Sequence, residues 1–136
     1  MPDMIDPNHS SCVMFGKSSN KIVKLNPFNP QNEAVEDLDI AKILKKTIPC
    51  GLARAVKNDL EKCVQSLKHA KNYRIHTFIS TSDLHIKHKL QKTKEEVLEL
   101  IKSSVEFAKK HTDDVEWSPE DATRTDPDYL CKTVEL

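Results

Sequence analysis

Two short stretches of the sequence alternate apolar side chains with polar ones of types that do chemistry. In Arg74–Ser80 (RIHTFIS), His76 lies on the face opposite the isoleucines, and in residues 115–120 (VEWSPE), Ser118 and Glu120 lie opposite Trp117. Strands covered by helices turn their apolar face to those helices, so the polar side chains would face the other way. Imidazole, hydroxyl and carboxylate groups gathered there can bind a substrate and move a proton. The alternative is a set of capping and surface groups at the strand ends.

Other polar residues give weaker signals. His85 and His88 lie three residues apart in a Lys-rich stretch, a spacing that can hold a metal on a helix. Nothing nearby completes the ligand set, so a solvated face is the favoured interpretation. The acids from Glu116 to Asp128 could bind a cation, although a helix start explains Asp126 and Asp128 without one. Neither glycine belongs to a phosphate-binding loop, and no Gly-x-Ser-x-Gly motif occurs.

The composition excludes several classes of protein. The 136 residues hold 21 Lys plus Arg and 21 Asp plus Glu, so the net charge of zero argues against nucleic acid and anionic membranes as partners. No apolar run approaches the roughly 20 residues that span a bilayer. The first eight residues lack a secretory pattern, and the four cysteines are scattered without a CxxC pair, so we expect a cytoplasmic protein with reduced thiols. The apolar fraction of 38% is low, which suggests partial disorder or a surface that another chain covers.

Alternating strand and helix signals indicate how the polar residues are positioned. Strands are predicted at 21–25, 48–53, 74–80 and 115–118, and helices at 33–46, from Asn58, from Thr93 and from Asp126. Asn58 with Glu61, and Thr93 with Glu96, have the spacing of a capping box, and Pro127 suits a first helical position. The segment 80–92 is predicted as a loop. Short strands alternating with helices predict βαβ units and a parallel sheet, whether open or part of a barrel.

Three segments resemble 2-isopropylmalate synthase and its homocitrate and citramalate synthase relatives: GLARAVKNDLEKCVQSLKHAK, RIHTFISTSDLHIKHKL and DDVEWSPEDATRTDPDYL. The resemblance is close over 50–130, weaker over 21–49 and absent over 1–20. It implies an α/β fold, a partial (β/α)8 TIM barrel of about four consecutive βα units with parallel strands. Residues 21–136 would be a partial catalytic domain, and residues 1–20 an unmatched tail, for which disorder is one reading.

The resemblance also implies an acyltransferase of leucine biosynthesis. Its family condenses acetyl-CoA with 2-oxoisovalerate, assisted by a divalent metal such as Mg²⁺ or Mn²⁺. Carried over by motif, His76 and Ser118 would bind the oxo acid, and Glu120 would be catalytic. Arg54 and Thr81, at strand ends within the matched region, are further substrate-binding candidates.

The sequence departs from the family where the metal is held. The family's Thr-Leu-Arg-Asp-Gly-Glu motif and its His-x-His pair have no match here. We therefore expect the metal ligands to be absent and the chain to be inactive alone. One alternative is a non-catalytic interaction module that forms a homo-oligomer or pairs with a complementary barrel fragment. Others are a truncated gene product, or a homocitrate or citramalate synthase by substrate.

Overall fold

The centre of the molecule is a four-stranded sheet in the order β1-β4-β5-β6. The computed structural model describes residues 13–15, 17–18, 21–22 and 47–136, and side chains in the last of these ranges. Strands β4 (Cys50–Arg54), β5 (Arg74–Ser80) and β6 (Val115–Glu120) are parallel neighbours. The short β1 (Val13–Phe15) pairs antiparallel with β4. The predicted parallel α/β sheet is therefore confirmed for these three strands.

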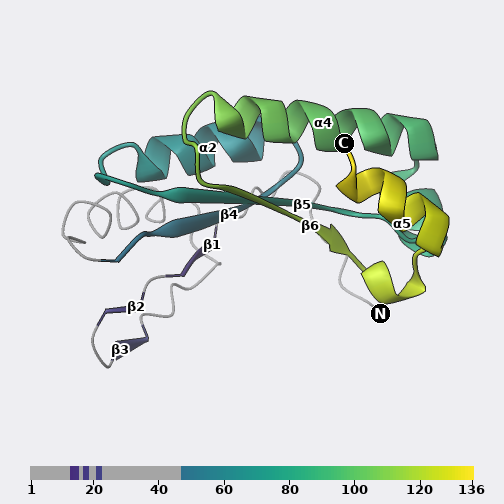
Figure 1. The fold of residues 1–136 in the computed structure, drawn as a ribbon, viewed down its shortest axis with the longest axis horizontal. Coiled ribbons are helices and arrows are strands. Elements are labelled where there is room, and N and C mark those ends of the chain that lie inside the picture. Colours follow the sequence, from purple (N-terminus) through teal and green to yellow (C-terminus); the bar gives the residue numbers. More distant parts are fainter. Residues whose placement is uncertain (1–12, 16, 19–20, 23–46) are drawn as a thin grey trace, which may run out of the picture.

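Helices cover one face of this sheet. Figure 1 shows α2 (Lys57–Leu67) and α4 (Lys94–Lys109) lying together along the same side. α5 (Pro127–Val134) follows β6 and reaches the start of α4, where the Tyr129 hydroxyl donates to the Lys94 carbonyl oxygen at 2.9 Å. Each parallel strand is thus followed by a helix, which is the order of consecutive βα units.

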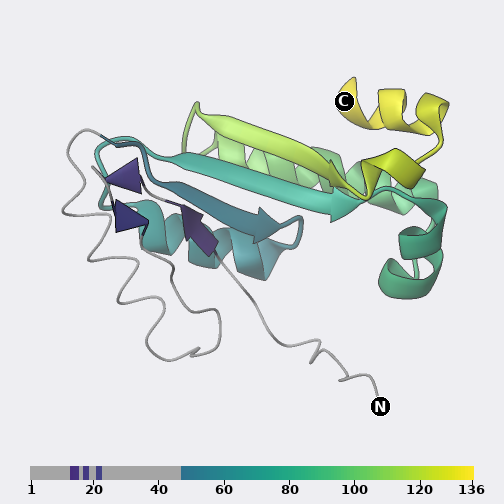
Figure 2. The same ribbon diagram turned by 90° about the horizontal axis from the view of Figure 1, so that it is seen from below.

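The apolar core lies between the helices and the sheet, in two clusters. One holds Ala53, Leu60, Cys63, Leu67, Ile75 and Ala108, and the other Ala55, Ile79, Ile86, Val97, Ile101 and Tyr129. Val115 packs against the first cluster and Trp117 against the second, which confirms that these two side chains face the helices. The polar residues that alternate with them on β6 therefore face away from the helices. Figure 2 presents that face, with β4, β5 and β6 side by side in front of the helices.

Two helix starts agree with the sequence and one does not. Thr93 and Glu96 form the predicted capping box, and Asp126 caps α5 with Pro127 in its first turn. For α2, however, the N-cap is Val56 and no side chain caps it, so the Asn58 prediction is wrong. The physical reason is that β4 leads into α2 almost directly, which places Asn58 inside the helix rather than ahead of it.

The segment after β5 is also different from its prediction. Residues predicted as a loop form α3 (Asp83–His85) and a π-helical turn η1 (Ile86–Leu90). The Ser82 side chain caps α3, and Gln91, with φ of 53°, ends η1 in the left-handed region. Ile86 is buried in the core, so one side of this turn is anchored beneath the helices.

The N-terminal predictions are only partly covered by the structure. The strand predicted at 21–25 is seen as β3 (Lys21–Ile22), which pairs antiparallel with β2 (Lys17–Ser18) and does not join the parallel sheet. The helix predicted at 33–46 lies outside the described residues.

The hydrogen bonds of β6 use alternate residues. Ile75 donates its N–H to the Asp114 carbonyl oxygen, and Thr81 donates to that of Glu120, both at 3.1 Å. Because a residue in a parallel strand turns its N–H and C=O to the same neighbour, even-numbered residues of β6 bond to β5. Pro119, which has no N–H, therefore lies at a position that faces away from β5.

Candidate functional site

His76 and Ser118 meet on the face of the sheet opposite the described helices α2 and α4. His76 Nε2 lies 2.7 Å from Ser118 Oγ, and His76 Nδ1 lies 3.8 Å from a carboxylate oxygen of Glu116. The side chain of His76 is 23% exposed. The structure thus brings together two of the predicted site residues, on the face predicted for them, because parallel register aligns β5 and β6 there. Their roles toward a substrate stay predictions.

Glu120 lies two residues beyond Ser118 on β6, in register with Ser80 of β5. Ser80 Oγ donates a hydrogen bond to Glu120 Oε2, and Lys89 Nζ donates to the same oxygen at 2.7 Å. Burial would raise the pKa of Glu120. The hydrogen bonds from Lys89 and Ser80 and the charges of Lys89 and His85 outweigh it and lower the pKa below its ordinary value. Glu120 is therefore held ionised at the carboxyl end of the sheet.

Thr81 extends this end of the sheet but turns its hydroxyl into the protein. Its side chain is fully buried, and its Oγ1 lies 2.7 Å from Thr125 Oγ1. Its backbone N–H donates to the carbonyl oxygen of Glu120 at 3.1 Å. Thr81 thus fastens the end of β5 to the segment after β6. Substrate binding by its side chain stays a prediction.

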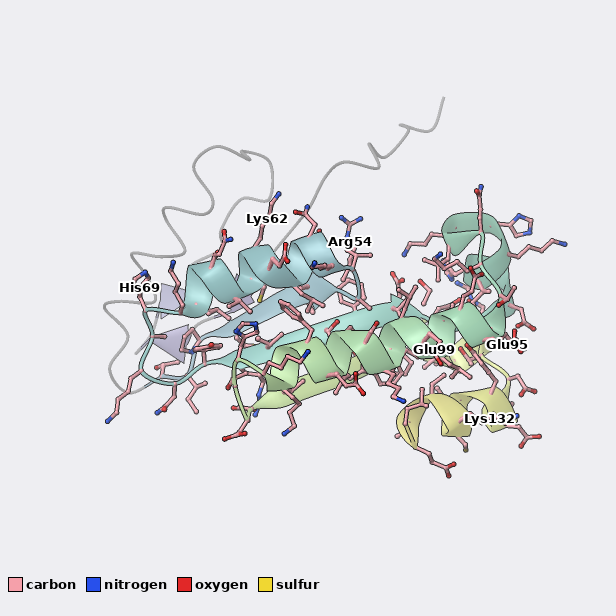
Figure 3. All side chains as sticks on the ribbon, turned by 90° about the horizontal axis from the view of Figure 1, so that it is seen from above. Arg54, Lys62, His69, Glu95, Glu99 and Lys132 are labelled. Carbon is pink, nitrogen blue, oxygen red and sulfur yellow. The ribbon has the colours of Figure 1, made fainter. Side chains whose placement is uncertain are left out.

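Arg54 is engaged with the first turn of α2. Its Nε donates to Asp59 Oδ2 at 2.6 Å, and its Nη2 lies 3.3 Å from Asp59 Oδ1. The Asp59 side chain is 1% exposed and that of Arg54 is 39% exposed, so a buried carboxylate is neutralised from its solvent side. Figure 3 labels Arg54 where β4 passes into α2. The guanidinium therefore has a structural partner, and its role toward a substrate stays a prediction.

Asp121 is a central residue of this end of the molecule, which the sequence placed only in a run of acids that could bind a cation. It has φ of 63° and accepts from Ser82 Oγ at 2.5 Å, from His85 Nδ1 at 2.8 Å and from Arg124 Nε at 2.8 and 3.0 Å. The hydrogen bonds from Ser82, Arg124 and His85 lower its pKa to about 2. The solvated interpretation is thus wrong for His85, while His88 is exposed as expected. The sequence did hold a signal for this contact. Two adjacent acids, Glu120 and Asp121, lie at the end of one strand, and a Ser-Asp-x-His sequence follows the neighbouring strand.

The carboxylates at this end of the sheet do not form a metal site. Among residues 47–136, no group of three His, Cys, Asp or Glu side chains is arranged to hold an ion. Glu120 and Asp121 each accept from a cationic side chain, Lys89 and Arg124 respectively. Positive side chains already occupy the positions around these carboxylates. The described residues therefore do not fit a divalent metal by themselves.

Two hollows in the described surface lie away from this face. One of about 350 Å³ lies between α2 and α4 and is lined by side chains such as Leu60, Ser104 and Phe107. The other, of about 430 Å³, lies near the amino ends of the strands beside Tyr73 and Asp114. Neither is lined by His76, Ser118 or Glu120.

None of the helices in the described part of the chain has the length and apolar character needed to cross a membrane.

Comparisons with known proteins give consistent matches. The sequence profile of the HMGL-like family matches residues 28–136. A 2-isopropylmalate synthase of Rhodopseudomonas palustris (strain BisA53) is 53% identical over 103 residues, which are 76% of this chain and 19% of that protein. A 2-isopropylmalate synthase of Bradyrhizobium sp. (strain ORS 278) is 52% identical over 103 residues, with the same coverage. One from Rhodopseudomonas palustris (strain TIE-1) is 48% identical over 109 residues, 80% of this chain and 21% of that protein. The chain spans about a fifth of the length of these curated relatives.

Proposed function

Since the chain belongs to the HMGL-like family, we propose that it is part of the catalytic barrel of an acyltransferase similar to 2-isopropylmalate synthase. The family has the TIM-barrel fold, so the partial (β/α)8 barrel predicted from the sequence is confirmed. The structure describes three of its units: β4 with α2, β5 with α4, and β6 with α5. The carboxyl ends of such strands carry the chemistry of barrel enzymes.

The proposed reaction joins acetyl-CoA to 2-oxoisovalerate in leucine biosynthesis, in the cytoplasm. A base takes a proton from the methyl group of acetyl-CoA, and the resulting carbanion forms a bond to the oxo carbon. The π bond of the oxo group breaks in this step, and its oxygen takes up a proton to become a hydroxyl group. Water then hydrolyses the thioester and releases the CoA thiol. The names of the relatives at 48–53% identity support this reaction.

The observation that carries the proposal is the pairing across β5 and β6. His76 with Ser118, and Ser80 with Glu120, are hydrogen-bonded side by side on one polar face. In the proposed site, His76 and Ser118 orient the oxo acid by hydrogen bonds to its oxygens. Glu120, held ionised, accepts or returns a proton at one carboxylate oxygen while the other stays bound to Ser80.

HMGL-like proteins generally depend on a metal. A divalent ion such as Mg²⁺ or Mn²⁺ would polarise the oxo carbonyl group of the substrate. Because residues 47–136 do not gather a ligand set, we place its ligands outside this range. The full sequence also lacks the family's Thr-Leu-Arg-Asp-Gly-Glu motif and its His-x-His pair, so we propose that the 136-residue chain is catalytically incomplete by itself. The test is release of CoA thiol from acetyl-CoA, with 2-oxoisovalerate and either ion; release that requires both would refute incompleteness.

A segment exchange tests the function of the site itself. Residues 50–130 of this chain would replace the matching segment of the Rhodopseudomonas palustris enzyme, and thiol release would be measured with 2-oxoisovalerate, 2-oxoglutarate and pyruvate. We expect activity with 2-oxoisovalerate above all. A preference for 2-oxoglutarate or pyruvate would instead indicate homocitrate- or citramalate-type specificity.

Matched variants of the exchanged segment separate the site from its surroundings. Glu120→Gln should lower kcat by roughly 10²-fold or more, because removal of a general acid or base typically has that effect. Glu99→Gln is the control, since Glu99 is exposed on α4 (Figure 3) and lies on the opposite side of the sheet. Equal kcat values for the two variants would refute the role of Glu120.

A second candidate, an interaction module, is favoured by exposed apolar groups at the end of α5 and directly after it. Val134 and Leu136 are 66% and 60% exposed, and the face of the sheet that carries His76 has no helix against it among the described elements. We propose that such a surface pairs with a second copy or with a complementary barrel fragment. Sedimentation equilibrium of the purified chain tests this: a monomer at all concentrations would exclude self-association.

A further inference from the structure

The segment that joins β5 to α4 is fastened to two successive residues at the end of β6. Lys89 Nζ lies 2.7 Å from Glu120 Oε2 and 3.3 Å from Ser80 Oγ. Four residues earlier, His85 Nδ1 lies 2.8 Å from Asp121 Oδ2. One short helical segment thus supplies a cationic partner to Glu120 and an imidazole to its neighbour.

The backbone of this segment is unusual. Residues Ile86–Leu90 form a π-helical turn. The turn begins directly after α3, which Ser82 caps, and it ends at Gln91, whose backbone is in the left-handed region. The wider turn shifts the side chains that follow it around the helix axis, and such turns recur at functional sites. Ile86 is buried under the helices while Lys89 reaches the carboxyl ends of β5 and β6. The turn therefore sets where the Lys89 ammonium group lies.

We propose that Lys89 is a positioning residue for Glu120, whose carboxylate it keeps ionised and fixed against Ser80. The proposal rests on the proposed function, in which Glu120 moves a proton. Both contacts use Oε2 of Glu120, so Oε1 has no hydrogen-bond partner among the described residues and can meet a substrate. Lys89 acts through Glu120 and does not itself take part in bond making.

The surroundings of Glu120 indicate what loss of Lys89 would do. Lys89 and Glu120 are about half and one third exposed, so their ion pair adds little to stability. The charged and polar groups that face Glu120 are Lys89 and His85 from the segment after β5, Ser80 from β5, and the adjacent Asp121, which is bound to Arg124. Burial opposes ionisation of Glu120, and Lys89 is the strongest group on the other side. Without Lys89 the pKa of Glu120 should rise.

The test is the titration of Glu120 by carboxyl ¹³C NMR in the full 136-residue chain, with the resonance assigned by its loss in Glu120→Gln. Lys89→Met should raise the midpoint relative to the unsubstituted chain, and Lys89→Arg should keep it low. Lys87→Met is the control, because Lys87 is an exposed lysine of the same turn. In the unsubstituted chain, 1 M salt should also raise the midpoint, since salt screens a partly exposed pair.

An unchanged midpoint in Lys89→Met, with the amide spectrum of the folded chain retained, would overturn the proposal. A midpoint that is insensitive to salt would overturn it as well, and this measurement leaves Lys89 unchanged. The titration requires no turnover, so it can succeed or fail independently of the thiol-release assay that tests the proposed function. A low midpoint with no activity in the segment exchange would reject the function and retain the positioning role.

Discussion

Replacing Thr77 by valine should make the protein more stable. Thr77 lies on the helix-facing side of β5, in register with Ala53 of β4 and Trp117 of β6. Its side chain is fully buried, and its hydroxyl has no hydrogen-bond partner within the described part of the chain. Valine has the same branched shape with a methyl group in place of that hydroxyl. The substitution therefore removes an unpaired polar atom without opening a cavity.

The size of the effect follows from the cost of an unpaired buried hydroxyl. Such a group destabilises the folded state by about 1–3 kcal/mol, because it loses its hydrogen bonds to water and gains none. We expect Thr77→Val to raise the free energy of unfolding by a value in that range. The same exchange at Thr81 provides the control, since the Thr81 hydroxyl bonds to Thr125 at 2.7 Å. Thr81→Val should lower the free energy of unfolding by about 0.5–1.5 kcal/mol.

Urea unfolding measures both changes. Far-UV circular dichroism follows the helices, and fluorescence of the single tryptophan, Trp117, follows the neighbouring strand. The midpoint should rise for Thr77→Val and fall for Thr81→Val, with the slope unchanged in each. A lower midpoint for Thr77→Val would refute the reasoning, because it would show that the Thr77 hydroxyl makes a favourable bond in solution.

Three further results are expected. Arg54→Met should lower the free energy of unfolding by roughly 2–3 kcal/mol in urea, because it leaves the buried Asp59 carboxylate without its ionic partner; an unchanged value would contradict this. The pKa of Asp121 falls from 3.8 to about 2 on folding, so its bonds stabilise the protein above about pH 4 and are lost as the pH falls toward 2. Unfolding measured at several acidic pH values should therefore depend less on pH in Asp121→Asn. Thr93→Ala should cost about 1 kcal/mol by removing the α4 cap, and thermal unfolding would show no change if the capping box were unimportant.

Sequence reasoning succeeded where the structure depends on local signals. The strand Arg74–Ser80 has strict alternation, and the structure gives it the same bounds. The capping box of Thr93 with Glu96 needs only residues three apart, and it forms as predicted. The start of α2 depends instead on the short connection from β4, and no capping residue type marks its N-cap, Val56. The Asn58 cap was wrong for that reason.

The candidate site likewise contains residues that local sequence patterns identified and residues that they did not. Alternation along two parallel strands was enough to place His76 and Ser118 on one face, and the structure joins them at 2.7 Å. Lys89 and Asp121 were not assigned to the site, because the partners that join them to it, Glu120, Ser82 and His85, are more than thirty residues away in the chain. A Lys- and His-rich stretch resembles a solvated loop until the acids at the end of β6 are placed beside it. Long-range ion pairs of this kind need the tertiary structure.

Pro119 affects how the edge of β6 can pair with a strand of another chain. No described strand pairs with the edge of β6 away from β5, where the odd-numbered residues turn their N–H and C=O groups, an arrangement that could template aggregation with another strand. At Pro119 that edge has no N–H, so a strand added there would lose a hydrogen bond beside Glu120. Among the odd-numbered residues of β6, only Val115 and Trp117 offer both an N–H and a C=O group on that edge, at the end away from the proposed chemistry. The same proline that separates Ser118 from Glu120 thus also makes this edge of β6 a poorer template for edge-to-edge pairing.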